Sequence, residues 1–233
     1  MRKLFILELF AGTSCISNEF RKHGHECFTI DWDKQFEVSM HCDIGKLELN
    51  DLPEEFRHPD VCWIAPECTT YSLAAISKHR VKNPLTGNLD PISDYARQCD
   101  EIDQHVLKLL EEMNPTIWFI ENPRACLQNM TWMKSLDKYK YLITYCKYQT
   151  DLPIQDRRMK PTNIWTNIPN PKFAPPCSNG NLDHAAAPRG SKTGTQGMKN
   201  AKERSTYPKQ LCEHIVKISE EYILERENAW NRN

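Results

Sequence analysis

Cys68 and Glu121 have the residue types and the positions that covalent catalysis needs. Cys68 lies in the turn 65–72, directly after the apolar run 61–64, and Glu121 directly follows a second apolar run, 116–120. In an open parallel α/β sheet, ligands bind outside the carboxyl ends of the strands. An arbitrary cysteine is more often a small buried hydrophobe. Two strands that each end in a reactive group can, however, bring a thiol and an acid into one pocket.

The N-terminal part of the chain has features of a nucleotide-type cofactor site. A strand-like run, 3–10, leads into the small-residue turn 11–14, and 16–22 has the pattern of a helix. Small residues let a ligand approach the backbone at a helix N-terminus, although the three-glycine dinucleotide signature is absent. A second strand, 26–30, ends at Asp31-Trp32-Asp33. An acid about 20 positions after the first turn is placed to bind a ribose, and the indole offers a face to an adenine.

Two further segments flank this expected cleft. Asp43, before Ile44, falls where a third strand would end, so its carboxylate could accept a hydrogen bond from an adenine amino group. An Asp before a loop is more often a helix cap or a turn former, and both interpretations stay open. Residues 77–87 are polar and basic without clear periodicity, which predicts a mobile loop beside the cleft.

The rest of the chain completes an α/β pattern. Apolar residues recur at helical spacing over 95–113, and β-rich runs follow at 139–148 and 162–166. Residues 169–202 are rich in Pro, Gly and Asn, which predicts loops that order on a partner. Residues 208–226 have the pattern of a closing amphipathic helix. The sequence therefore predicts an α/β fold, with a mostly parallel sheet, helices on both faces and a small loop-rich C-terminal region.

Length and cysteine usage indicate one intracellular domain. The 233 residues suffice for one sizeable domain but not for two large ones. Ten cysteines at irregular spacing, without a Cys-x-x-Cys pair, fit reduced thiols in a cytosolic protein better than a disulfide framework. The run 1–7 imitates a signal peptide, but Glu8 interrupts it, and no run approaches membrane-spanning length. We expect a cytoplasmic monomer with no membrane partner.

Charge is distributed unevenly along the chain. Residues 155–209, the basic segment, contain ten Lys and Arg against three acidic residues. This segment carries +7 and the remainder −8, for a formal net charge of −1. A basic block can be a solvated face, but one that is also rich in Gly, Ser, Thr and Asn is suited to contact phosphates. We therefore expect a nucleic-acid partner.

The order of these motifs resembles the DNA (cytosine-5)-methyltransferase family. The residues that carry the resemblance are Phe10-Ala11-Gly12, Asp31-Trp32-Asp33, Asp43, Pro66-x-Cys68-x-x-Tyr71-Ser72, Glu121-Asn122-Pro123 and Gln155-x-Arg157. The small size of the chain and its segments 189–191 and 193–197, Arg-Gly-Ser and Thr-Gly-Thr-Gln-Gly, are most similar to compact bacteriophage-type members. The likeness covers residues 4–167 and then thins.

The resemblance implies a reaction and a set of site residues. S-adenosylmethionine would be the cofactor, and a cytosine flipped out of duplex DNA would accept the methyl group on carbon 5. Cys68 would be the covalent nucleophile, Glu121 the acid at ring nitrogen 3 and Arg157 a stabiliser of the cytosine carbonyl. No metal is implied. The implied cofactor-binding residues are Phe10, Ala11, Gly12, Thr13, Ser14, Asp31, Trp32, Asp43, Ile44 and Pro66.

The resemblance also implies an organisation and a biological setting. Residues 1–167 would form a Rossmann-like catalytic domain that binds the cofactor, and 168–207 a reduced target-recognition region that contacts DNA. Residues 208–233 would form a helix that packs back on the catalytic domain. The setting would be bacteriophage or restriction–modification DNA methylation, in the host-cell cytoplasm if the chain is phage-encoded.

Three positions depart from the family pattern. Glu67 precedes the nucleophile where the family usually has Pro, and Pro123 stands where Val or another residue is usual. Met159 takes the place of a second Arg, for which Arg158 or Lys160 could substitute. A carboxylate at Glu67 would oppose ionisation of the neighbouring thiol unless it points away.

Two alternative functions remain open on the same fold. One is an RNA cytosine-5 methyltransferase, and the other is a catalytically inactive DNA-binding module. A nicotinamide oxidoreductase is disfavoured because the second glycine of its phosphate loop is missing. Amino-group methylation is disfavoured because the chain has no Asp/Asn-Pro-Pro-aromatic loop and does contain a candidate thiol nucleophile.

Overall fold

A seven-stranded sheet forms the centre of the computed structural model, which describes residues 1–178, 180–185 and 205–230. Across the sheet the strands follow the order β3 (Met40–His41), β2 (Glu26–Asp31), β1 (Phe5–Leu9), β4 (Val61–Ile64), β7 (Ile117–Pro123), β9 (Pro161–Thr166) and β8 (Lys140–Thr144). The five strands from β3 to β7 are parallel, whereas β9 is antiparallel to both β7 and β8. The predicted mostly parallel α/β sheet is therefore confirmed.

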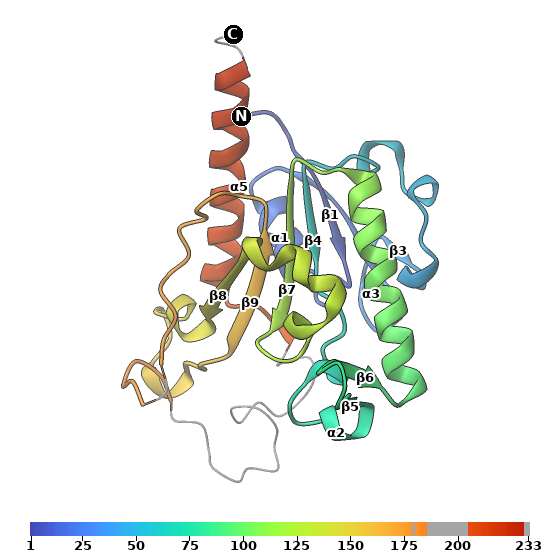
Figure 1. Cartoon of the computed structure of the whole chain (residues 1–233). Helices are drawn as coiled ribbons and strands as arrows, with labels where there is room; N and C mark the ends of the chain where they lie inside the picture. Colours follow the sequence, from blue (N-terminus) through green and yellow to red (C-terminus); the bar gives the residue numbers. More distant parts are fainter. Residues whose placement is uncertain (179, 186–204, 231–233) are drawn as a thin grey trace.

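Helices cover both faces of the sheet (Figure 1). Within the described residues the α-helices are α1 (Cys15–Lys22), α2 (Ile76–His79), α3 (Asp94–Met113) and α5 (Lys209–Trp230). Along β4, Cys62 and Ile64 pack into the core under α3, whereas Val61 and Trp63 pack into the core under α1 and α5. The alternation of side chains along a strand thus explains why all four residues of β4 are apolar and buried.

Local capping defines the ends of α3, the longest helix on its face. The Ser93 hydroxyl accepts a hydrogen bond from the Ala96 amide at the N-terminus. At the other end Asn114 adopts a left-handed conformation with a φ of 44°, and Pro115 follows. These signals agree with the helix predicted over residues 95–113.

The prediction of a mobile loop over residues 77–87 is wrong. Its first residues belong to α2, and the next form β5 (Arg80–Lys82), which pairs antiparallel with β6 (Leu89–Pro91). Figure 1 shows this hairpin and α2 at the bottom of the molecule, beside the lower end of α3. The segment is ordered although it has no periodic apolar pattern, because a polar side chain anchors it.

That anchor is the buried guanidinium of Arg80. It donates to the two Asp100 carboxylate oxygens on α3, at 2.6 and 3.0 Å, and to the Thr70 carbonyl at 3.0 Å. It also lies 4.2 Å from the centre of the Tyr71 ring. Removing one partner of a buried ion pair leaves an uncompensated charge. The hairpin is therefore fixed to α3 and to the turn that carries Cys68.

The C-terminal helix α5 packs against α1 and the sheet. Its buried face includes Leu211, Ile215 and Ile218, which join Ile16 and Phe20 of α1 in one apolar core. The helix extends four residues beyond the predicted range 208–226. None of the helices within the described ranges is long and apolar enough to cross a membrane. Residues 186–204 of the predicted target-recognition region lie outside the described residues.

Candidate active site

The turn that carries Cys68 is fastened to α3 by Tyr71. The Tyr71 hydroxyl lies 2.8 Å from the Asp100 carboxylate and 2.6 Å from the Asp103 carboxylate, and all three groups are buried. Burial raises the pKa of Asp103 to about 7, so this carboxyl holds its proton to a higher pH than an exposed aspartate. The Tyr71 carbonyl also accepts from the Cys126 amide at 3.0 Å. These contacts hold the Cys68 turn in place.

Glu121 lies within β7, where the strand continues past its apolar run. The Tyr145 hydroxyl donates to its Oε1 at 3.3 Å, and the Tyr207 hydroxyl donates to its Oε2 at 3.1 Å. Burial raises the pKa of Glu121, while the Lys160 ammonium and the two tyrosine hydroxyls oppose that rise. The carboxyl therefore keeps its proton to a higher pH than an exposed glutamate, which suits a proton donor.

The register of β4 and β7 and a hydrogen bond from the Asn122 side chain bring Cys68 and Glu121 to the same edge of the sheet. Ile64, the last residue of β4, pairs with Ile120, so Cys68 lies just beyond the end of β4 and Glu121 lies within the neighbouring parallel strand β7, next to the end of β4. The Asn122 side-chain amide donates to the Pro66 carbonyl at 3.0 Å. The negative charge of Glu121 also raises the pKa of Cys68, which reflects their proximity. The structure thus brings the predicted nucleophile and acid together.

The Cys68 thiol is far from ionised at neutral pH. Burial raises its pKa to about 11, the Glu67 carboxylate adds to the rise, and the Lys160 ammonium opposes it. Glu67 folds back over the turn, where its Oε1 accepts from the Thr69 amide at 2.8 Å and from the Thr69 hydroxyl. The carboxylate that replaces the usual proline therefore does not point away from the thiol.

The predicted cofactor turn has an unusual backbone. Phe10, Gly12 and Ser14 all have positive φ, at 57°, 50° and 53°. Positive φ is uncommon outside glycine and marks a conformation that the surrounding structure must impose. The Ala11 amide donates to the Ile30 carbonyl of β2 at 3.0 Å, and the Thr13 hydroxyl lies 3.0 Å from the Cys15 thiol at the start of α1. The Ser14 hydroxyl oxygen is buried without a hydrogen-bond partner among the described residues.

Asp31 fixes this turn to the end of β2. Its Oδ2 accepts from the Gly12 amide at 2.8 Å, and its Oδ1 accepts from the Asp33 amide at 2.9 Å. A carboxylate has about four lone-pair sites, so both oxygens retain the capacity to accept from ribose hydroxyls. Trp32 next to it is 69% exposed, which leaves its ring available for stacking. The residues present fit an adenosine-type cofactor.

Asp43 and Ile44 have structural roles. Asp43 lies two residues beyond β3, and its Oδ1 accepts from the Gly45 amide at 3.1 Å as the cap of the short 3₁₀ turn Ile44–Lys46. Ile44 is buried in the core under α3. The helix-cap interpretation of Asp43 therefore holds, and its contact with an adenine stays a prediction.

Arg157 and Lys160 differ in what they contact. The Arg157 guanidinium donates to the backbone carbonyls of Leu152 at 2.9 Å, Thr150 at 3.1 Å and Asp183 at 3.5 Å. Among the described residues, no hydrogen bond or ion pair joins it to the nucleophile or to the acid. The Lys160 ammonium lies 4.7 Å from the centre of the Tyr145 ring and lowers the pKa of both Cys68 and Glu121. Lys160 is therefore a cation that acts on the predicted nucleophile and the predicted acid.

The sequence interpretation missed the two tyrosines that hold the acid. Tyr207 lies 86 residues from Glu121, just before α5, and its ring also packs edge-on against Trp63. Tyr145 directly follows β8. No local pattern marks either residue, because their role depends on the way distant segments meet.

Comparison with known proteins gives one match in sequence among curated proteins. The chain is 26% identical over 152 residues to the type II methyltransferase M.BsuFI of Bacillus subtilis, an alignment that covers 60% of this chain. The same alignment covers 32% of the relative, so the chain matches about a third of that protein's length. No family model matches the chain.

Two solved structures are similar at lower identity. The Dnmt2 methyltransferase of S. pombe is 13% identical with a TM-score of 0.45, and the match covers 70% of this chain and 49% of that one. The Entamoeba histolytica methyltransferase EhMeth is 14% identical with a TM-score of 0.45, and the match covers 72% and 54% of the two chains.

Methyltransferases of this fold use S-adenosylmethionine, and the turn 10–14 together with Asp31 and Trp32 fits that cofactor. The similarity to a type II methyltransferase agrees with the kind of protein that the order of the motifs predicts. The predicted resemblance of this chain to the cytosine-5 methyltransferases is thereby confirmed.

Proposed function

We propose that this chain transfers a methyl group to carbon 5 of cytosine in DNA through a covalent bond to Cys68. The observation that carries the proposal is the juxtaposition of Cys68 and the tyrosine-held carboxyl of Glu121 at one edge of the sheet. The cofactor-type turn 10–14 directly follows β1, the strand next to β4. A thiol, an acid and a cofactor turn on adjacent strand ends match the needs of this reaction.

Carbon 5 of cytosine is too weak a nucleophile to react until a thiolate adds to carbon 6. The Cys68 thiol first loses its proton to solvent. As its sulfur bonds to carbon 6, the Glu121 proton passes to ring nitrogen 3, and the electron pair of the 5,6 double bond becomes available at carbon 5. S-adenosylmethionine supplies the methyl group to that carbon. A water molecule then takes the proton on carbon 5, which restores the double bond, expels the thiolate and returns the ring proton to Glu121.

The pKa values support this division of roles. The raised pKa of Glu121 keeps a proton available for the ring, while the Cys68 thiol, with a pKa of about 11, is mostly protonated in the free protein. The Lys160 ammonium favours the thiolate. We propose that Lys160 supplies the positive charge for which the family uses a second arginine. Arg157, in this proposal, stabilises the cytosine carbonyl only after its loop rearranges.

DNA is the proposed substrate because of the basic segment. Its +7 charge suits a phosphate backbone, and a target base flipped from a duplex costs a few kcal/mol that phosphate contacts can offset. We propose that the protein is a monomer in which residues 1–167 catalyse methyl transfer and residues 168–207 contact the target DNA. Residues 208–233 would pack against the catalytic part and support it. Tyr207 lies at the junction of the last two parts and binds Glu121.

Nucleoside mass spectrometry of incubated substrates tests the proposal. Duplex DNA and structured RNA are each incubated with the protein and S-adenosylmethionine, and Cys68→Ser serves as the control. The proposal predicts 5-methylcytosine in DNA with the wild-type chain and none with Cys68→Ser. Methylation of RNA alone would support the RNA enzyme. Binding of DNA without any methylated nucleoside would support the inactive DNA-binding module.

A further inference from the structure

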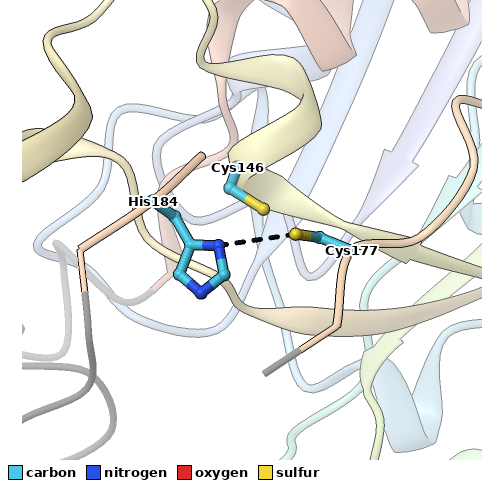
Figure 2. Close-up of side chains that lie close together, drawn as sticks. All are labelled: Cys146, Cys177 and His184. Carbon is cyan, nitrogen blue, oxygen red and sulfur yellow. Dashed lines mark hydrogen bonds between the residues drawn. The ribbon is translucent and has the colours of Figure 1, made fainter. Parts of the chain in front are cut away.

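Two cysteines and a histidine meet outside the candidate active site. Cys146 lies in the 3₁₀ turn Tyr145–Tyr148 after β8, and Cys177 and His184 lie in the segment that follows β9. Their ligand atoms all lie within 4.8 Å of one another, and the Cys177 sulfur is 3.4 Å from the His184 Nδ1. Figure 2 shows both sulfurs and the imidazole nitrogen pointing toward a common centre. The proposed methyl transfer uses none of them.

The spacing of these atoms suits a tetrahedral metal ion. Zinc binds sulfur at about 2.3 Å and nitrogen at about 2.0–2.1 Å, so tetrahedral ligand atoms are separated by about 3.5–3.8 Å. The Cys177–His184 pair is already near that separation, and small side-chain rotations would bring in the Cys146 sulfur. Two thiolates also neutralise a divalent zinc ion, which makes the site compatible with the burial of Cys146 and His184.

The backbone around the cluster is held in place by other contacts. The Cys177 amide donates to the Thr144 hydroxyl at 2.8 Å, at the end of β8. The Lys147 ammonium forms an ion pair with Asp183 at 2.8 Å, so the neighbours of two cluster residues are themselves joined. Such supporting contacts orient metal ligands and limit the reorganisation that binding requires.

We propose that Cys146, Cys177 and His184 bind a zinc ion. Both thiols lose their protons to solvent on binding, His184 coordinates through the neutral Nδ1, and a water molecule fills the fourth position. The ion would fasten the segment 177–184 to the end of β8, immediately before the central part of the basic segment. The proposal stands independently of the proposed methyl transfer, because it concerns only these three side chains.

The metal content of the full chain tests the proposal. The protein is purified under reducing conditions without chelator, and zinc is measured by plasma mass spectrometry. We expect about one zinc per chain, and loss of most of it in Cys146→Ser, Cys177→Ser and His184→Ala. Cys27→Ser is the matched control, because Cys27 lies on β2 outside the cluster, and it should retain the metal.

Cobalt substitution of the wild-type chain tests the same site without a variant that could misfold. Tetrahedral Co²⁺ bound by two thiolates should give a sulfur-to-metal charge-transfer band and strong visible bands, with release of about two protons per ion. Absence of zinc together with absence of these cobalt bands in the reduced protein would overturn the proposal. Zinc retained equally by the three cluster variants and the control would also overturn it. A Cys146–Cys177 disulfide in the protein as purified would do so as well.

Discussion

The cofactor side and the reactive side of the candidate active site are built in different ways. On the cofactor side, Asp31 is held by backbone amides, and the adjacent Trp32 is open to solvent. On the reactive side, Cys68 and Glu121 are surrounded by other side chains, and burial raises the pKa of both. The first arrangement prepares a surface for binding, and the second prepares groups for proton transfer. Substitutions on the two sides should therefore change different measured quantities.

The largest effect should come from Glu121→Gln on the reactive side. The amide keeps the shape of the side chain, and its one oxygen can still accept from one of the two tyrosine hydroxyls while its NH₂ group can donate to the other, but it cannot deliver the acid proton. We expect methyl transfer to fall by about 10²–10⁴-fold in single-turnover assays, with cofactor affinity unchanged. Glu112→Gln, on the exposed face of α3, is the matched control. A methyl-transfer rate of Glu121→Gln close to that of the control would show that Glu121 is not the acid of the reaction.

Asp31→Ala tests the cofactor side. The ribose would lose a charged hydrogen-bond acceptor, and the Gly12 and Asp33 amides would lose their partner. A hydrogen bond to a charged group contributes about 1.5–3 kcal/mol, which corresponds to about 10–150-fold weaker cofactor binding by calorimetry. DNA affinity should stay close to that of the wild type. Equal losses in the two titrations would contradict the assignment of Asp31 to the cofactor.

Lys160→Met and Arg158→Met together test which of these two residues replaces the missing second arginine. Loss of the ammonium should raise the pKa of Cys68 further, and each added pKa unit lowers the thiolate fraction about tenfold. We expect methyl transfer to fall by about tenfold. Arg158→Met is the matched substitution, because the Arg158 guanidinium binds the backbone carbonyls of Gln155 and Arg157. A larger loss in Arg158→Met than in Lys160→Met would reverse the assignment.

Glu67→Gln should give the smallest effect, and in the opposite direction. Alkylation of Cys68 by iodoacetamide requires the thiolate, so its rate should rise with pH until the pH reaches the thiol pKa of about 11. Removing the neighbouring carboxylate should shift this profile to lower pH and speed alkylation a few-fold at neutral pH. Peptide mapping reports Cys68 separately from the other cysteines. An unchanged profile would mean that burial alone sets the pKa.

The features that sequence could predict are those encoded locally. The apolar runs before Cys68 and Glu121 and the position of Asp31 follow from strand periodicity and the order of motifs. The sequence could not predict the Arg80–Asp100 anchor or the Tyr207–Glu121 contact, because each depends on segments that meet only in the folded chain. The prediction of a mobile loop failed for this reason: one buried ion pair orders a segment that has no apolar pattern.

Covalent trapping tests the central claim most directly, because it detects the bond between Cys68 and the target base. DNA that carries fluorine on carbon 5 of cytosine can accept the methyl group, but it then has no proton there to lose, so elimination of the thiolate is blocked. The account predicts a denaturant-resistant protein–DNA complex that requires S-adenosylmethionine, maps to Cys68 and is absent in Cys68→Ser. A complex that persists in Cys68→Ser, or that maps to any of the other nine cysteines, would contradict it.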